Sequence, residues 1–339
     1  MDIKAAIKEI KRGQVSPLYL CYGSEKYQIQ EFIQLIQDQI VDPENRDFAV
    51  VHYDLADTQI ETVVEEAETL PFLVERKLVL VRDSSLFSAA KEGGKIEHKV
   101  DRLLTYLDNP AEHSVVVFTV NGEKLDERKK TVKAMKAKGQ VLSFMPLGGH
   151  ELIQWVIKQA ASRDCTMDET AAQALLASAG VQMAALSAEV NKLCLYAGAG
   201  GTITAEAINQ LVARTTEQNV FGMVEDIANL KLERALSTFY ELLKQREEPI
   251  KIAALIARQF RIMLQVKELG GQSYSQQQIA SQLGLHPYAV KIAGEQARKF
   301  EASRLRSSLS ELAELDYRMK SGRIDKVLGL EMFLLGLGA

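Results

Sequence analysis

The chain has 339 residues, of which 47% are hydrophobic and 25% charged, and this composition excludes a disordered or fibrous protein. The formal net charge is −4, so no general attraction to DNA or to an acidic membrane surface is expected. Cys21, Cys165 and Cys194 form no CxxC pair, and no run of 18 apolar residues occurs. We therefore expect a cytoplasmic protein without membrane contact.

The first part of the chain alternates strand and helix patterns. Residues 1–13 have helical spacing. Ser24 and a capping box at residues 58–61 are expected to start two further helices, and another helix is expected over residues 100–107. Nearly continuous apolar runs are typical of parallel strands buried on both faces. They occur at 17–22, 48–53, 77–81, 114–120 and 140–144. The pattern predicts an α/β domain with a five-stranded parallel sheet and helices on both faces.

Strand patterns stop after about residue 147, and the rest of the chain is predicted to be helical. A small helical domain is expected over 147–213, with Asp168 and Thr204 as helix N-caps. Long helical patterns then fill an all-α domain at 214–339, and the α/β domain takes 1–146. Residues 214–339 carry 18 basic and 15 acidic side chains, which makes them the only net-basic part.

The sequence shows no constellation for catalysis. The turn after the first strand, residues 22–27, has one glycine and lacks the GxxxxGK[ST] loop that cradles phosphates. The five histidines form no HExxH motif, and no GxSxG motif occurs. We therefore predict no catalytic residue, no metal site, no cofactor and no ATPase site.

Two groups of basic residues are candidates for contacts with DNA phosphates or with acidic partners. Lys124, Arg128 and Lys129 follow the fourth strand. Arg258 and Arg261 lie on one long helix of the last domain. Most such cations are simply solvated, so composition alone leaves both roles open.

Residues 275–300 have the pattern of a helix-turn-helix. Ser275 caps a short helix, Gly284 forms the turn, and Pro287 opens a second helix. A DNA reader would place Arg, Asn or Gln at the start of that helix, whereas this chain has Pro287, Tyr288 and Ala289. The alternatives are a structural helical hairpin and a DNA-binding regulator.

An apolar segment, Leu70, Pro71, Phe72 and Leu73, connects a helix to the third strand. Pro71 ends the helix and forces Leu70 towards extended geometry. Loops are usually polar, so the three large apolar side chains need an explanation. Either they fold against the sheet as part of the core, or they are an anchor for the pocket of a partner.

Eight stretches follow one another in a recognisable order: residues 18–23, 67–72, 76–81, 124–130, 217–221, 247–252, 259–261 and 315–320. In this order they resemble the delta subunit of the bacterial DNA polymerase III clamp loader, and the resemblance covers nearly the whole chain. One departure is Gly222, where a bulkier helical residue is expected.

The resemblance implies an AAA+-like α/β domain that has lost ATP binding, a lid-like helical domain and a helical collar. It implies a non-catalytic subunit of the DNA polymerase III holoenzyme that binds the beta sliding clamp and opens it for loading onto primed DNA. Leu70, Pro71, Phe72 and Leu73 would be the clamp-binding element, which favours the anchor over the core. The other implied partners are ATPase subunits of the tau or gamma type and a delta-prime subunit, joined through the collar in a pentameric assembly.

Overall fold

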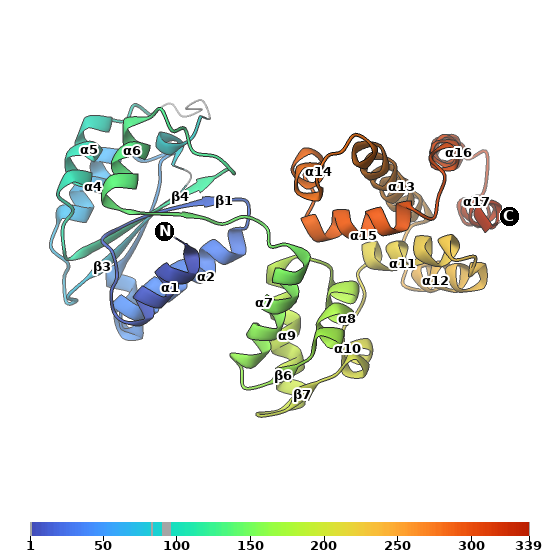
Figure 1. The fold of residues 1–339 in the computed structure, drawn as a ribbon, viewed down its shortest axis with the longest axis horizontal. Helices are drawn as coiled ribbons and strands as arrows, with labels where there is room; N and C mark the ends of the chain where they lie inside the picture. Colours follow the sequence, from blue (N-terminus) through green and yellow to red (C-terminus); the bar gives the residue numbers. More distant parts are fainter. Residues whose placement is uncertain (1, 83, 90–95, 339) are drawn as a thin grey trace. The chain divides into compact units, whose positions relative to one another are not determined.

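The computed structural model describes residues 2–82, 84–89 and 96–338 (Figure 1). The chain divides into two compact units, Met1–Pro146 and Leu147–Ala339. The division of the second unit at residues 213 and 214 stays a prediction.

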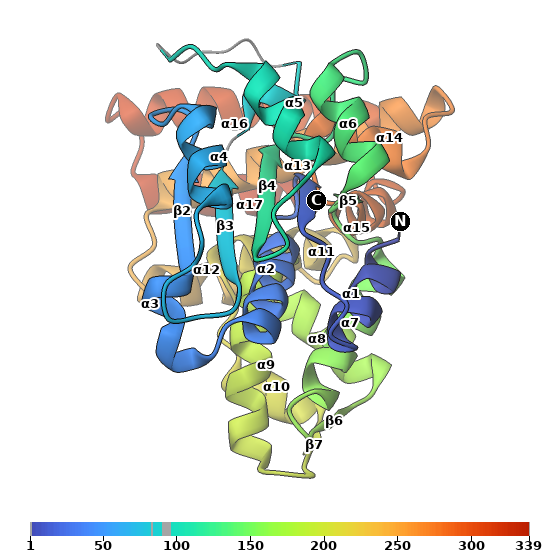
Figure 2. The same ribbon diagram turned by 90° about the vertical axis from the view of Figure 1, so that its left-hand side faces the viewer.

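The first unit is built on the predicted five-stranded parallel sheet, in the order β2-β3-β4-β1-β5. Figure 2 shows β2, β3 and β4 side by side. Three of the strands are buried along nearly their whole length, because their apolar runs meet helices on both faces. The strands are β1 (Leu18–Gly23), β2 (Val50–Asp54), β3 (Lys77–Arg82), β4 (Ser114–Asn121) and β5 (Gln140–Ser143).

Helices cover both faces of this sheet (Figure 1), as predicted. One apolar core lies under α1 and α2, and includes Phe32, Ile36 and Phe144. The other lies under α4, α5 and α6, and includes Val64 and Leu107. The helical elements are α1 (Ile3–Lys11), α2 (Lys26–Ile40), η1 (Pro43–Asn45), α3 (Arg46–Ala49), α4 (Ile60–Glu68), η2 (Ser85–Phe87), α5 (Val100–Asp108) and α6 (Lys130–Lys138).

Two predicted helix starts in this unit are wrong. The N-cap of α2 is Glu25, and the Ser24 hydroxyl instead donates to Glu123 at 3.4 Å. The capping box at residues 58–61 does not form, because the Thr58 hydroxyl bonds Asp57 and a Glu61 carboxylate oxygen accepts the backbone N–H of Lys99. In both cases a tertiary or neighbouring partner takes the side chain that the local pattern assigned to the cap.

The second strand is also shorter than predicted, because residues 46–49 form α3 and Phe48 is exposed.

The second unit is mainly helical. Asp168 and Thr204 cap α8 and α10 as predicted, each accepting a backbone N–H. A parallel pair of two-residue strands, β6 (Thr166–Met167) and β7 (Thr202–Ile203), was not expected. The helices are α7 (Gly149–Ala161), α8 (Glu169–Ala179), α9 (Met183–Ala197), α10 (Ala205–Leu211), α11 (Thr216–Ala228), α12 (Leu232–Lys244), α13 (Pro249–Gly271), α14 (Gln276–Leu283), α15 (Pro287–Ala297), α16 (Ala302–Lys320) and α17 (Lys326–Gly338).

The last seven of these helices pack around one large apolar core and one small one. The large core joins residues of α11, α12, α13, α16 and α17, among them Phe239 and Phe260. The small core joins α13, α14 and α15. The helix α11 runs through Gly222 without interruption and is capped by the Thr215 hydroxyl.

Candidate functional site

The segment that joins α4 to β3 exposes three large apolar side chains. The side chain of Leu70 is 77% exposed, that of Phe72 is 73% exposed and that of Leu73 is 69% exposed. We call residues 70–73 the apolar knuckle. Because these side chains are in solvent, they contribute nothing to the core, and the hypothesis that they fold against the sheet is wrong. A cluster of exposed apolar side chains is typical of an interaction site.

The base of the apolar knuckle is fixed by side chains that cap the end of α4. The last carbonyl groups of a helix lack partners within the helix. Here the buried Lys77 ammonium donates to the Glu66 carbonyl oxygen and, at 2.6 Å, to the Glu66 carboxylate. The Ser114 hydroxyl donates to Ala67 O at 2.6 Å, and His113 Nε2 lies 3.1 Å from Thr69 O. The helix end is thereby tied to the first residues of β3 and β4.

These supporting residues were not identified from the sequence, although Lys77 carried a signal. It stands at the first position of a buried strand and is 3% exposed, where a lysine needs a charged or carbonyl partner. Which partner it would find depends on the tertiary structure.

Leu73 has an unusual backbone conformation. Its φ is +63°, in the left-handed region that residues with a side chain rarely occupy. Such strain persists only where the surroundings enforce it, and it clusters at functional sites. The chain bends over residues 72–75, between the extended Thr69 and the start of β3.

The turn between β1 and α2, where a nucleotide-binding chain would hold phosphate, is filled by backbone. The Glu25 N–H donates to Phe144 O at 3.1 Å, and the Phe144 N–H donates to Tyr22 O at 2.7 Å. A Cβ at Gly23 would lie 1.9 Å from the Phe144 carbonyl oxygen. Burial raises the pKa of the Glu25 carboxyl, against a smaller lowering by the Tyr27 N–H. The turn therefore presents an acid and a carbonyl where phosphate binding needs free N–H donors.

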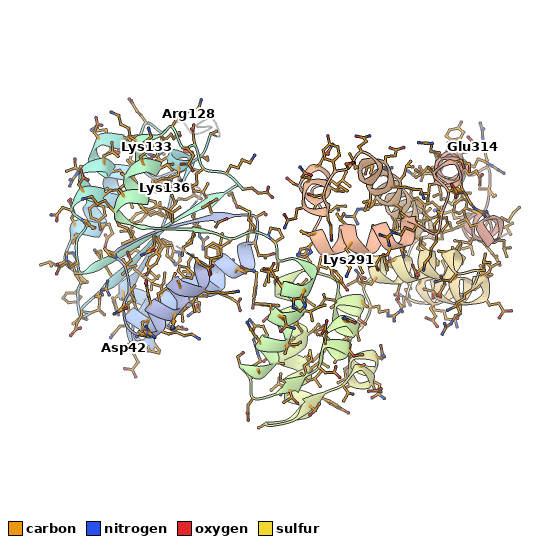
Figure 3. The ribbon with its side chains drawn as sticks, viewed as in Figure 1. Asp42, Arg128, Lys133, Lys136, Lys291 and Glu314 are labelled. Atoms are coloured by element: carbon orange, nitrogen blue, oxygen red, sulfur yellow. The ribbon has the colours of Figure 1, made fainter. Side chains whose placement is uncertain are left out.

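The basic residues after β4 differ in whether their side chains have hydrogen-bond or ion-pair partners. Arg128 pairs with Asp126 through two hydrogen bonds of 2.9 Å, which lowers the pKa of the Asp126 carboxyl to about 2. Lys129 donates to Ser85 O at 2.9 Å. Lys124 is exposed and has no partner among the described residues. Lys133 and Lys136, which Figure 3 labels together with Arg128, are exposed on α6, and Lys136 pairs with Glu127 at 2.6 Å.

The helix-turn-helix geometry of α14 and α15 forms as predicted, with the Ser275 capping box and Gly284 in the left-handed conformation. However, the start of α15 packs within its own unit. A Cβ at Gly149 of α7 would lie 2.7 Å from the Tyr288 ring, and Ala289 lines a cavity between helices. A DNA reader would need this helix start free to enter the major groove, so the arrangement favours the structural hairpin.

No group of His, Cys, Asp or Glu side chains suited to a metal ion occurs among the described residues. None of the described helices has the length and apolar character to span a bilayer.

Comparisons with known proteins cover most of the chain. The family model described as "DNA polymerase III, delta subunit" matches residues 19–145, and the model of the C-terminal domain of the same subunit matches 217–337. The DNA polymerase III subunit delta of Bacillus subtilis is 41% identical over 97% of this chain and 95% of its own length. A probable DNA polymerase III subunit delta of Aquifex aeolicus is 20% identical over 71% of this chain and 67% of its own.

A solved structure gives the same relationship. The DNA clamp loader delta protein of Bacillus subtilis matches with a TM-score of 0.82 and 40% identity, and the match covers 99% of both chains. The chain therefore belongs to the delta subunit family of the bacterial DNA polymerase III clamp loader.

Proposed function

We propose that this clamp-loader delta subunit binds the beta sliding clamp through the apolar knuckle and opens the clamp for loading onto primed DNA. The observation that carries the proposal is the exposure of Leu70, Phe72 and Leu73 on a helix end held by side-chain hydrogen bonds. Exposed aromatic and aliphatic side chains on a well-ordered backbone are typical of the hot-spot residues that dominate protein interfaces.

The apolar knuckle offers enough binding energy for a specific complex. Burying two large apolar side chains contributes about 3–6 kcal/mol at ordinary transfer values. Pro71 stiffens the link between Leu70 and Phe72, which lowers the entropy lost on insertion. Removal of both side chains should therefore weaken binding by about two orders of magnitude or more.

Opening requires more than binding. A partner shifts a conformational equilibrium only to the extent that it binds one state more tightly than the other. The delta subunit would open the clamp if the apolar knuckle fits the open conformation better than the closed one. Binding energy, rather than a chemical step on this chain, would then drive the change.

We further propose that the chain acts without nucleotide of its own. The Glu25 N–H at the start of α2 already has the Phe144 carbonyl oxygen as its acceptor, and the turn has no lysine followed by Ser or Thr. ATP-dependent control would then come from the ATPase subunits of the tau or gamma type, which with delta-prime would complete the assembly. Contacts of Lys124, Arg128 and Lys129 with primed DNA stay part of this proposal.

The test is clamp binding by the Leu70→Ser and Phe72→Ser double variant. We expect the clamp affinity to fall about 100-fold or more, while the melting temperature changes by less than about 2 °C because both side chains are exposed. Surface plasmon resonance and differential scanning calorimetry on the same preparations measure the two quantities.

Phe48→Ser is the matched control, because Phe48 is 61% exposed and lies outside the apolar knuckle. It should leave clamp affinity unchanged. Full clamp binding by the double variant would refute the assignment, and so would a fall of its melting temperature by about 10 °C, the mark of a core position.

A further inference from the structure

A cavity of about 290 Å³ lies in the second unit, between the turn that joins α8 to α9 and the helices α11, α13 and α15. Its walls are mostly apolar. They include Leu176, Phe221, Leu255, Ile262 and Ile292. A cavity of this kind can accept a large apolar side chain from outside, as pockets at the centres of interfaces do.

Two residues that line the cavity, Phe221 and Gln259, are joined by a buried side chain behind them. The buried Gln296 side chain accepts a hydrogen bond from Gln259 Nε2 at 2.7 Å and donates one to Phe221 O at 3.2 Å. Because these polar groups satisfy each other, an entering apolar side chain would leave none of them unpaired. Binding of a side chain in the cavity would therefore cost little entropy for ordering the residues around it.

One side of the cavity carries an unpaired cation. Arg258 lines the cavity from α13, and Arg261 follows one turn later. Both are exposed, and neither forms an ion pair or hydrogen bond with a described residue.

The remaining charged residues of α13 have partners. Lys251 pairs with Glu247 at 2.7 Å, Lys267 donates to two backbone carbonyl groups, and Glu268 pairs with Arg306 at 2.6 Å. The two arginines beside the cavity are therefore the cations of this helix that are available to a partner. Arginine suits carboxylates because its guanidinium donates two parallel hydrogen bonds.

Glu217 also lines the cavity, from α11. A carboxylate at this position can accept a backbone N–H of an entering segment. The lining thus offers an apolar site for a side chain, a cation for a carboxylate and an acceptor for a main chain. These three features match the groups that a bound peptide segment presents.

We propose that this cavity docks an acidic segment of another clamp-loader subunit, which inserts one large apolar side chain and places a carboxylate on Arg258, with Arg261 beside it. DNA is the less suitable occupant, because its phosphate backbone would use the arginines and leave the apolar cavity unfilled. The inference rests on the proposed function only in its choice of a loader subunit as the partner, and it does not involve the apolar knuckle.

The test is assembly of the full chain with the ATPase subunit and the delta-prime subunit of the same loader, measured by fluorescence anisotropy and gel filtration. Arg258→Glu reverses the charge, and Ala177→Phe fills the cavity from its exposed edge on α8. We expect each variant to bind one of the two subunits at least about tenfold more weakly, with clamp binding unchanged. Arg234→Glu is the matched control, because Arg234 is exposed on α12 and does not line the cavity.

The outcomes separate the two proposals. Unchanged assembly by both variants overturns the docking site, and so does a wild-type chain that binds the clamp but neither loader subunit. Weaker binding of a primed oligonucleotide by Arg258→Glu, with assembly intact, also overturns it and assigns the arginines to phosphate. A wild-type chain that fails to bind the clamp refutes the proposed function, whatever the assembly result.

Discussion

The two edges of the parallel sheet differ in how their connections are filled. At the carboxyl edge, the turn after β1 is closed by the backbone of Phe144, which leaves no room for a Cβ at Gly23. At the amino edge, the connection into β3 holds three large apolar side chains in solvent. Open α/β sheets usually bind ligands at the carboxyl edge. In this chain the exposed apolar side chains are at the opposite edge.

The difference separates a connection closed by backbone from one that exposes apolar side chains, the arrangement that the proposed clamp contact requires. Backbone groups close the first turn, where the Glu25 N–H is already bonded to the Phe144 carbonyl oxygen. Side chains from β3 and β4 support the second connection, so its apolar residues need no packing of their own. The same sheet order supports both arrangements, because loops change without disturbing the strands.

Gly23→Ala should have the largest effect on stability. The new Cβ would meet the Phe144 carbonyl oxygen, and the φ of +143° at this residue is accessible almost only to glycine. We expect a loss of about 3 kcal/mol in the free energy of unfolding, measured by urea denaturation. Gly122→Ala is the control, because its Cβ would meet nothing within 4 Å. Equal stability of the two variants would show that the turn is open.

Lys77→Met should have the next largest effect, at the other edge. It removes the charged donor from the end of α4 and leaves the Glu66 carbonyl group without its partner. We expect a loss of about 2 kcal/mol by urea denaturation, together with weaker clamp binding as the apolar knuckle loosens. Lys99→Met is the comparison, because Lys99 is 81% exposed in its pair with Glu61 and should contribute less than about 0.5 kcal/mol. An unchanged free energy of unfolding in Lys77→Met would mean that the helix end is held without this side chain.

Leu73→Gly should separate binding from stability. Glycine relieves the left-handed strain but adds freedom to the unfolded chain, so the free energy of unfolding should change by less than about 1 kcal/mol. Loss of the side chain should weaken clamp binding about tenfold or more, as it should in Leu73→Ala. Calorimetry and clamp titration on both variants test this, and tight binding by Leu73→Gly would exclude Leu73 from the contact.

Glu25→Gln should have the smallest effect, and it should depend on pH. Burial raises the pKa of Glu25 in the folded chain above its ordinary value of 4.5, so the unfolded chain ionises first as the pH rises. Stability should therefore be lost as the pH rises through the folded pKa. The glutamine variant should melt slightly higher than the wild type at pH 7 and at the same temperature near pH 4. The opposite sign at pH 7 would show that hydrogen bonds to the carboxylate outweigh its burial.

The sequence predicted the larger features because they depend on long patterns. The five apolar runs predicted the strands of the sheet, and Pro71 marked the end of α4. The exposure of Leu70 and Phe72 could not be decided from their types, since an apolar residue in a loop fits a core and an anchor equally well. The resemblance to the delta subunit family favours the anchor, and the exposure of both side chains agrees with it.

The supports of the site could not be predicted, because they join residues that are distant in the chain. Ser114 and Lys77 reach α4 only after β3 and β4 pair in register. The same reason explains the wrong cap at Ser24, whose hydroxyl bonds the distant Glu123, whereas Thr58 bonds its neighbour Asp57.

The hydrogen bonds at the end of α4 also have a mechanical consequence. Lys77 is the first residue of β3 and is bonded to the end of α4, so a pull on the apolar knuckle reaches that strand, and its component along the strand axis loads the pairing of β3. The bonds of β3 to β2 and β4 lie across this axis, and several of them must break together before the strand can slide. A load in this direction is a shear load, which the paired strands resist together. The same load on a free loop would only straighten the loop.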